Sequence, residues 1–177
     1  MEFTKTLLMR RSCRAYSEVQ LHEDMVEKLL ESANLAPVGR KKYEEVHLTV
    51  VQNREFLSTL TDRFRTAVGD PAVSPFYGAP MLIVVSVKSP EGEVPLVSMA
   101  NAACAVDHMH LCAADLGLGS VYIYGAMTVL RGNPDLIAQL GLPEGFLPAS
   151  ALAVGYSLDE EQAPRVPETH FSRSDLR

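Results

Sequence analysis

The chain has 177 residues, of which 47% are hydrophobic, and a formal net charge of −6. This length supports one core and leaves little room for a second, so residues 1–177 are predicted to form a single domain. The acidic balance argues against a nucleic-acid partner, since binding to a phosphate backbone needs a broad basic surface. No apolar run reaches the roughly 18 residues of a membrane span, and the first residues show no secretory pattern, so no membrane partner is expected.

The three cysteines, Cys13, Cys104 and Cys112, are sparse and show no metal-ligand spacing. This usage is typical of reduced thiols in a cytosol, so we expect a cytoplasmic protein without a metal site. Cys104 and Cys112 fall on one predicted helix, about 12 Å apart, which is too far for a disulfide. We interpret both as small core residues.

Hydrophobic periodicity predicts the elements in chain order. Helices are expected at residues 3–9, 22–36, 54–65 (capped by Asn53), 95–116 and 133–140. Strands are expected at residues 46–52, 81–87, 120–124 and 149–156, and a Gly- and Pro-rich loop at residues 69–80. The strand at 81–87 is apolar on both faces, which indicates a central strand covered on both sides. Strands alternating with dominant helices predict a mixed central β-sheet flanked by helices.

The predicted helix at residues 95–116 is apolar nearly all round, which favours burial in the core or against another subunit. Its two histidines, His108 and His110, lack partners at metal-ligand spacing, and we interpret them as core or interface residues. Residues from about 157 to 177 are polar and contain Pro164 and Pro167, so they are expected to form an extended tail that packs on a partner. Helix and tail together favour a homodimer.

Residues 9–16, Met-Arg-Arg-Ser-Cys-Arg-Ala-Tyr, place three arginines and a serine within five positions of an acidic chain. Arginine meets a phosphate with a planar fork of donors, so the cluster indicates a small anionic ligand. The alternative is that Arg10 and Arg11 end a helix and neutralise the negative end of its dipole. A Walker or Rossmann glycine pattern is absent, which argues against a nucleoside triphosphate or a dinucleotide site.

Three further segments follow this cluster in order: Ala-Pro-Val-Gly-Arg at 36–40, Ala-Asp-Leu-Gly-Leu-Gly-Ser-Val-Tyr-Ile-Tyr-Gly at 114–125, and Leu-Gly-Leu-Pro-Glu-Gly at 140–145 before Val-Gly-Tyr at 154–156. In this order and spacing they resemble the FMN-dependent nitroreductase family, over about residues 9–156. The resemblance implies a nitroreductase-like α+β fold in an intertwined homodimer. It also implies that FMN binds at the dimer interface, with contacts from both subunits.

The resemblance assigns the arginine cluster to the cofactor. Arg10 and Arg11 would bind the FMN phosphate, and Ser12 would contact the ribityl and phosphate region. Arg14 would lie near N1 and O2 of the ring, where a cation stabilises the charge of the reduced flavin.

Three further parts of the chain would border the ring. Those implied by the resemblance are the loop from the other subunit (Pro37, Val38 and Gly39), an amide near the ring (Asn101), and the strand end facing N5 and O4 (Tyr122, Ile123, Tyr124 and Gly125). The backbone amides of Tyr124 and Gly125 would act as donors there. Taken singly, Gly39 is typical of a turn, Gly125 of a strand terminator, and Asn101 of a satisfied core polar group.

The sequence departs from the family after residue 39. Where many members have Asn and then Gln-Pro-Trp, this chain has Lys41 and no such run, and it contains no Trp. Lys41 would offer a further cation to the cofactor or be solvated, and Tyr43 is a candidate pocket wall. In the tail, Arg165 or Arg173 would reach the FMN phosphate, with Arg165 assigned to the site. The short loop at residues 67–76 predicts a small lid over an open pocket.

The resemblance therefore implies an FMN-dependent NAD(P)H oxidoreductase that reduces nitroaromatic, quinone or similar electron-poor acceptors. Reduced nicotinamide would give a hydride to flavin N5 and leave, and the acceptor would then take the electrons at the same site. No catalytic side chain is expected, since such double displacement needs no protein acid or base. The alternatives are an FMN store or sensor without efficient turnover, and a site for another phosphorylated ligand.

Overall fold

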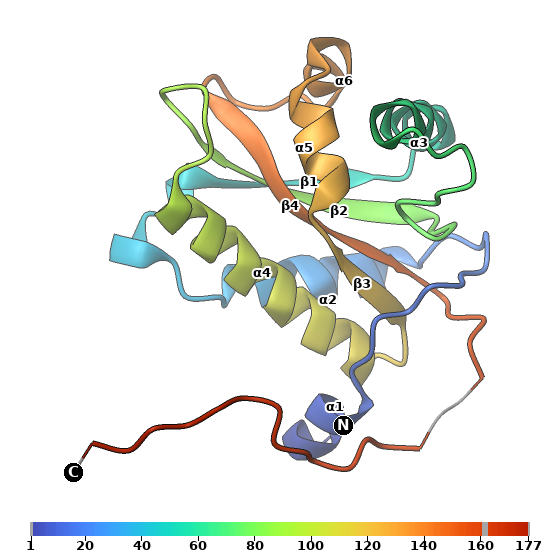
Figure 1. Ribbon diagram of the computed structural model, residues 1–177, viewed down its shortest axis with the longest axis vertical. Coiled ribbons are helices and arrows are strands. Elements are labelled where there is room, and N and C mark those ends of the chain that lie inside the picture. Colours follow the sequence, from blue (N-terminus) through green and yellow to red (C-terminus); the bar gives the residue numbers. More distant parts are fainter. Residues whose placement is uncertain (1, 161–162, 177) are drawn as a thin grey trace.

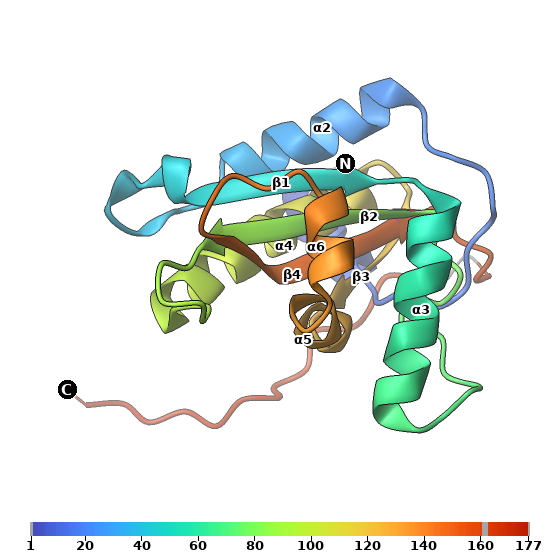
Figure 2. The same cartoon turned by 90° about the horizontal axis from the view of Figure 1, so that it is seen from above.

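A four-stranded β-sheet runs through the centre of the protein, with helices against both of its faces (Figure 1, Figure 2). The computed structural model describes residues 2–160 and 163–176. The strands lie in the order β1-β2-β4-β3, and they comprise β1 (Val46–Val51), β2 (Met81–Lys88), β3 (Gly119–Ile123) and β4 (Phe146–Gly155). The central position predicted for β2 is confirmed, because it pairs with β1 on one side and β4 on the other.

The expectation of a mixed sheet is wrong for these strands, because all three pairs are antiparallel. Strand–helix alternation predicted parallel neighbours, and β2 and β3 do run the same way across the helix between them. However, the last strand, β4, enters between β2 and β3 in the opposite direction and separates them. The only parallel contact among the described residues is the isolated bridge between Ser12 and Ser120.

The helices divide between the two faces of the sheet. One face carries α2 (Glu23–Asn34) and α4 (Leu96–Asp115), and the other carries α3 (Arg54–Val68), α5 (Gly125–Arg131) and α6 (Pro134–Gln139). Strand β2 supplies both cores, with Ile83 and Val85 toward α2 and α4, and Leu82 and Val84 toward the other three helices. This double burial explains why the strand is apolar throughout.

Most predicted elements are confirmed within a few residues. Helix α3 begins after Asn53, whose Oδ1 accepts a hydrogen bond from the Phe56 amide at 3.0 Å. Helix α5 was not predicted, because it begins at a glycine directly after β3 and has only two turns of pattern. Its buried Ala126, Met127 and Leu130 show that tertiary packing stabilises it. Two 3₁₀ turns, η1 (Gly39–Lys41) and η2 (Tyr43–Glu45), were likewise not predicted.

Helix α4 is buried on only one of its faces. Ala102, Val106 and Met109 pack against the sheet, whereas Cys104 and Cys112 lie on a half-buried face. The interpretation of these two cysteines as core residues is therefore wrong in degree: they flank the core and are half-exposed. Both are free thiols, as their spacing on one helix predicted.

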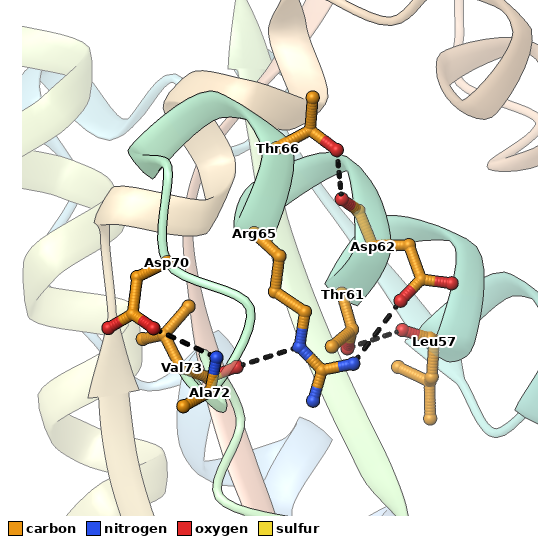
Figure 3. Close-up of polar contacts among 8 residues, drawn as sticks. All are labelled: Leu57, Thr61, Asp62, Arg65, Thr66, Asp70, Ala72 and Val73. Atoms are coloured by element: carbon orange, nitrogen blue, oxygen red, sulfur yellow. Dashed lines mark hydrogen bonds and ion pairs between the residues drawn. The ribbon is translucent and has the colours of Figure 1, made fainter.

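The loop between α3 and β2 is fastened to α3 by polar contacts (Figure 3). The Arg65 guanidinium donates from Nε to the Val73 carbonyl at 3.0 Å and from Nη1 to Asp62 Oδ1 at 3.3 Å. The Asp70 carboxylate accepts from the Ala72 amide at 2.8 Å. These contacts hold the first part of the loop against α3, and farther along the loop Phe76 is buried and Tyr77 is half-buried.

The tail leaves β4, passes beneath α1 (Phe3–Met9) and then runs out alone, without helix or strand in its described residues (Figure 1). Its first part bonds to the N-terminal segment of the same chain, through Leu158 N to Ala15 O and Arg165 N to Leu8 O. The extended character of residues 163–176 is confirmed, and contact of the tail with a partner subunit stays a prediction. Among the described residues, no helix is long and apolar enough to cross a membrane.

Candidate functional site

The arginine segment, residues 10–14, lies along β3, which is an edge strand of the sheet. The chain leaves α1 at Arg10, whose amide closes the helix on Thr6 O at 2.9 Å. It then meets the strand: the Cys13 amide donates to Ser120 O at 2.9 Å, and Ser12 forms the parallel bridge with Ser120. The edge strand therefore sets the position of Arg11, Ser12 and Arg14 relative to the sheet.

Arg10 ends α1, as the simpler interpretation expected, but its side chain has a specific partner. Its Nη1 lies 2.8 Å from Nε2 of His110, and Nδ1 of His110 lies 2.5 Å from Ser120 Oγ. Burial, together with the Arg10 charge, lowers the pKa of His110 to about 4. The imidazole is therefore neutral at pH 7, and it connects the end of α1 to β3.

This buried histidine predicts a pH dependence of stability. Its folded-state pKa lies below the usual 6.5, so between pH 6.5 and 4 the unfolded chain binds more protons at this residue. The free energy of unfolding should therefore fall as pH is lowered, by up to roughly 3 kcal/mol from this group. Urea denaturation at pH 7, 5.5 and 4.5 measures it, with His110→Gln as the matched control. Equal pH slopes in the wild type and the variant would contradict the prediction.

Further cations lie beside Arg10. Arg165 approaches the same end of α1, where its Nη2 donates to Leu7 O at 3.0 Å, and Arg11 Nη2 donates to Ala163 O at 2.6 Å. Burial lowers the pKa of Arg10, and the Arg165 charge lowers it further. Like charges gathered at one place favour an anion there. Arg173 instead pairs with Asp175 at 2.7 Å, so the structure associates Arg165, and not Arg173, with this group.

A cavity of about 470 Å³ opens beside the arginine segment. Arg11, Ser12 and Ser120 line it, together with the backbone of the Gly117–Gly119 turn. Two tail carboxylates, Asp159 and Glu160, also line it. The cavity thus combines donors on the sheet side with acceptors on the tail side.

Gly119, in the wall of this cavity, leaves no room for a side chain. A Cβ there would lie 2.6 Å from Cys13 Sγ and 3.0 Å from Ser157 Cβ. Gly119→Ala should therefore displace residue 13 and lower the free energy of unfolding by about 1–3 kcal/mol, as overpacking does. Urea denaturation checks this, with Gly132→Ala as the control, because a Cβ at Gly132 meets nothing closer than 3.4 Å. Similar losses in the two variants would refute the argument.

A second cavity, of about 300 Å³, lies at the far end of β3. Its walls include the predicted strand end, Tyr122, Ile123, Tyr124 and Gly125, and the aromatic rings of Phe64 and Tyr77. Arg14 points to the same place, since its Cζ lies 5.7 Å from the centre of the Tyr77 ring. Tyr77 itself has φ of 56°, which is unusual for a bulky residue. An aromatic-walled cavity with a cation at its edge suits a planar, electron-poor group.

The segment at residues 37–41 belongs to a separate location. The Gly39 amide donates to Asn101 Oδ1 at 3.0 Å, so the half-buried Asn101 is not a core polar group but holds this turn. Lys41 is exposed, and both Arg40 and Lys41 adopt positive φ, of 58° and 57°. Tyr43, the candidate pocket wall, is exposed at 47%.

The structure of one chain therefore brings the expected residues together in two groups. One is formed by the arginine segment and residues 122–125, which lie along β3, with Arg165 bonded to the end of α1 beside Arg10. The other is formed by Pro37, Val38, Gly39, Lys41 and Asn101. The two groups contact helix α4 at different places, the first through His110 and the second through Asn101. These residues are nine positions apart, or about 14 Å along the helix axis.

Three contributors to the site were missed from the sequence. Tyr77 follows an irregular loop without a motif, and Ser120 was assigned only to a strand. His110 was noticed but had no visible partner, since Arg10 is 100 positions away. Within residues 2–160 and 163–176, no three His, Cys, Asp or Glu side chains are grouped closely enough to hold a metal ion.

The chain is similar to known proteins over most of its length. Residues 7–156 match the Nitroreductase family. A protein of Archaeoglobus fulgidus that carries the provisional name NADH dehydrogenase/NAD(P)H nitroreductase is 30% identical over 161 residues, covering 90% of this chain and 88% of its own. An FMN reductase (NAD(P)H) of Bacillus subtilis is 26% identical over 202 residues, covering 99% of this chain and 77% of its own.

Solved structures give the same result. The crystal structure of a nitroreductase with bound FMN from Bacteroides fragilis superposes with a TM-score of 0.83 at 27% identity, and the match covers 100% of both chains. The family match spans both ends of the candidate site, from α1 to the end of β4. On the sequence match and the shared fold together, the chain belongs to the nitroreductase family.

Proposed function

We propose that this protein is an FMN-dependent NAD(P)H oxidoreductase that reduces electron-poor acceptors such as nitroaromatics or quinones. The observation that carries the proposal is the arrangement along β3: a cluster of guanidinium groups at one end and an aromatic-walled cavity with Arg14 at the other. The relatives named for FMN and NAD(P)H support the same assignment.

The residues fit the two ends of FMN. From Ser120 to Tyr124 the strand advances about 13 Å, so one elongated ligand can place a phosphate and a ring at the two sites. The phosphate would lie among Arg10, Arg11 and Arg165, with Ser12 beside the ribityl chain. The ring would lie at residues 122–125, where the Tyr124 and Gly125 amides are proposed as donors.

FMN, when bound, supplies the chemistry of accepting a hydride and passing electrons on. The chain's own residues bind, orient and shelter it. Arg14, held above the Tyr77 ring, would place a positive charge beside the flavin pyrimidine edge. The aromatic walls formed by Phe64, Tyr77 and Tyr124 would orient a planar acceptor and exclude water. No side chain needs to transfer a proton.

The second group of residues enters the proposal through a homodimer. The outward face of α4 presents Val97, Cys104, His108 and Leu111 at helical spacing, and all are at least partly exposed in the single chain. Leu96 and Leu35 nearby are exposed at 90% and 78%. Such an apolar surface favours a partner. A two-fold dimer across α4 would bring residues 37–41 and Asn101 of one subunit to the flavin of the other.

The proposal is tested first by the visible absorption spectrum of the purified protein, followed by heat release and identification of any flavin. The expected result is FMN at about one per subunit. The second step is steady-state oxidation of NADH and NADPH with an added quinone or nitroaromatic. Turnover with such an acceptor supports the oxidoreductase.

The other outcomes identify the alternatives. Bound FMN without turnover would favour a flavin store or sensor, for which the unusual residues 41–45, beside the second group, give a specific reason. A colourless protein that also fails to take up added FMN would overturn the proposal. The guanidinium cluster would then belong to a different phosphorylated ligand.

A further inference from the structure

The hydrogen-bond chain from Arg10 through His110 to Ser120 has only one possible arrangement of protons. Arginine has donors and no acceptor, so His110 Nε2, at 2.8 Å from Arg10 Nη1, must be the unprotonated nitrogen. A neutral imidazole carries one proton, which is then on Nδ1 and is donated to Ser120 Oγ at 2.5 Å. Geometry alone therefore fixes the tautomer.

The Arg10–His110–Ser120 hydrogen bonds hold the Arg10 cation in place without neutralising its charge. His110 is buried, with 5% of its surface exposed, and it uses one of the five N–H groups of Arg10. Among residues 2–160 and 163–176, no other hydrogen-bond partner of the Arg10 side chain is found, which leaves its remaining donors for an anion. The acid whose charge acts on Arg10 is Asp107, which is exposed and lies one turn before His110 on α4. A carboxylate partner would cancel the charge of Arg10, whereas a neutral acceptor restrains the side chain and leaves its full charge available.

The same hydrogen bonds also connect two elements of the site, the end of α1 and strand β3. Ser120 accepts from His110 through its side chain and from Cys13 through its backbone carbonyl. The same strand residue thus positions Arg10, through His110, and Ser12 and Cys13, through the backbone. Neither His110 nor Ser120 Oγ needs to touch the ligand for this to act.

We propose that His110 is a positioning residue for phosphate recognition: as the Nδ1–H tautomer, fixed by Ser120, it aims the Arg10 guanidinium at the ligand phosphate. The inference rests on the proposed function, since it takes FMN as the phosphorylated ligand. It adds a residue that does not itself contact the cofactor.

Two matched variants separate the two nitrogens. In His110→Gln, the longer amide can present an oxygen to Arg10 in place of Nε2. In His110→Asn, the shorter amide can replace only Nδ1 and reach Ser120, which leaves Arg10 without its acceptor. Both variants remove the ring, so loss of packing is common to both. Thermal unfolding followed by circular dichroism establishes that each is folded.

The measurement is fluorescence titration of the apo-protein with FMN and with riboflavin, which lacks the phosphate. In His110→Asn, the FMN dissociation constant should rise by about threefold to tenfold, the effect of one hydrogen bond. In His110→Gln it should stay within about twofold of wild type. Riboflavin affinity should be unchanged in both. Equal losses for FMN and riboflavin, or no loss in His110→Asn, would overturn the inference.

A spectroscopic measurement tests the tautomer without any flavin. In ¹H–¹⁵N NMR of the wild-type protein at pH 7, one of the five histidines should show the neutral Nδ1–H tautomer, and Arg10→Ala should perturb that signal. An Nε2–H tautomer or a charged ring at His110 would refute the inference. Should the wild type bind no FMN, the proposed function fails, while the tautomer still reports on the Arg10–His110–Ser120 chain.

Discussion

Arg10→Ala should weaken FMN binding by about tenfold to a hundredfold, the equivalent of losing charge-assisted hydrogen bonds to a phosphate. Arg10 is held by His110 at 2.8 Å and lies beside Arg165, so its loss removes the centre of the cation cluster. Fluorescence titration with FMN measures the effect. Riboflavin should bind the variant as it binds wild type, because the change is confined to the phosphate end.

Two control variants test whether the loss of FMN affinity is specific to the Arg10 guanidinium. Arg173→Ala removes an arginine that pairs with Asp175 in the exposed tail, so FMN affinity should not change. Arg10→Lys keeps the charge but lacks the planar fork, so its affinity should lie between those of wild type and alanine. If Arg10→Ala binds FMN as wild type does, the phosphate does not lie at this cluster, and Arg10 serves only to end α1.

Co-expressing two variants, each defective in FMN binding, should restore activity at limiting FMN if the site is shared between subunits. In Gly39→Trp, a large side chain would occupy the space proposed for the partner's flavin. Gly39 is exposed, and a Cβ there meets nothing closer than 3.5 Å within its own chain, so the fold should tolerate it. Arg10→Ala disables the other group. A heterodimer would carry one site with both defects and one with neither.

The expected activity is about one quarter of wild type, since random exchange gives half heterodimers and each has one intact site. NADH oxidation with a quinone, measured after co-expression, gives the result. Each variant expressed alone is the control. Activity no higher than the sum of the two variants alone would show that the site lies within one chain.

The local sequence determined most of the secondary structure. Asn53 at the start of α3, the apolar run of β2 and the periodicity of α2 each carry their signal within a few residues, and each was predicted correctly. Helix α5 and the two 3₁₀ turns were not predicted, because short elements depend on tertiary packing rather than on a sequence pattern. The antiparallel direction of the strand pairs was also not predicted, since it depends on the insertion of β4 between β2 and β3.

The arginine segment could be identified as an anion site from residue type alone, because three guanidinium groups in five positions have an uncommon charge density. The contacts that each arginine makes could not be predicted from the sequence. Arg10 meets a histidine 100 positions later, Arg14 lies over a tyrosine in an irregular loop, and Arg165 returns from the tail to α1. Such contacts join segments that no periodicity relates.

The sequence by itself thus determined the elements, the central place of β2 and the location of the cationic cluster, because these follow from short-range chemistry. Only the tertiary structure decided the antiparallel insertion of β4, the neutral partner of Arg10 and the separation of residues 37–41 from the arginine segment. Each of these depends on which surfaces meet when two distant segments pack. Burial of apolar area stabilises that packing, but it leaves no local pattern in the sequence from which the contact could be predicted.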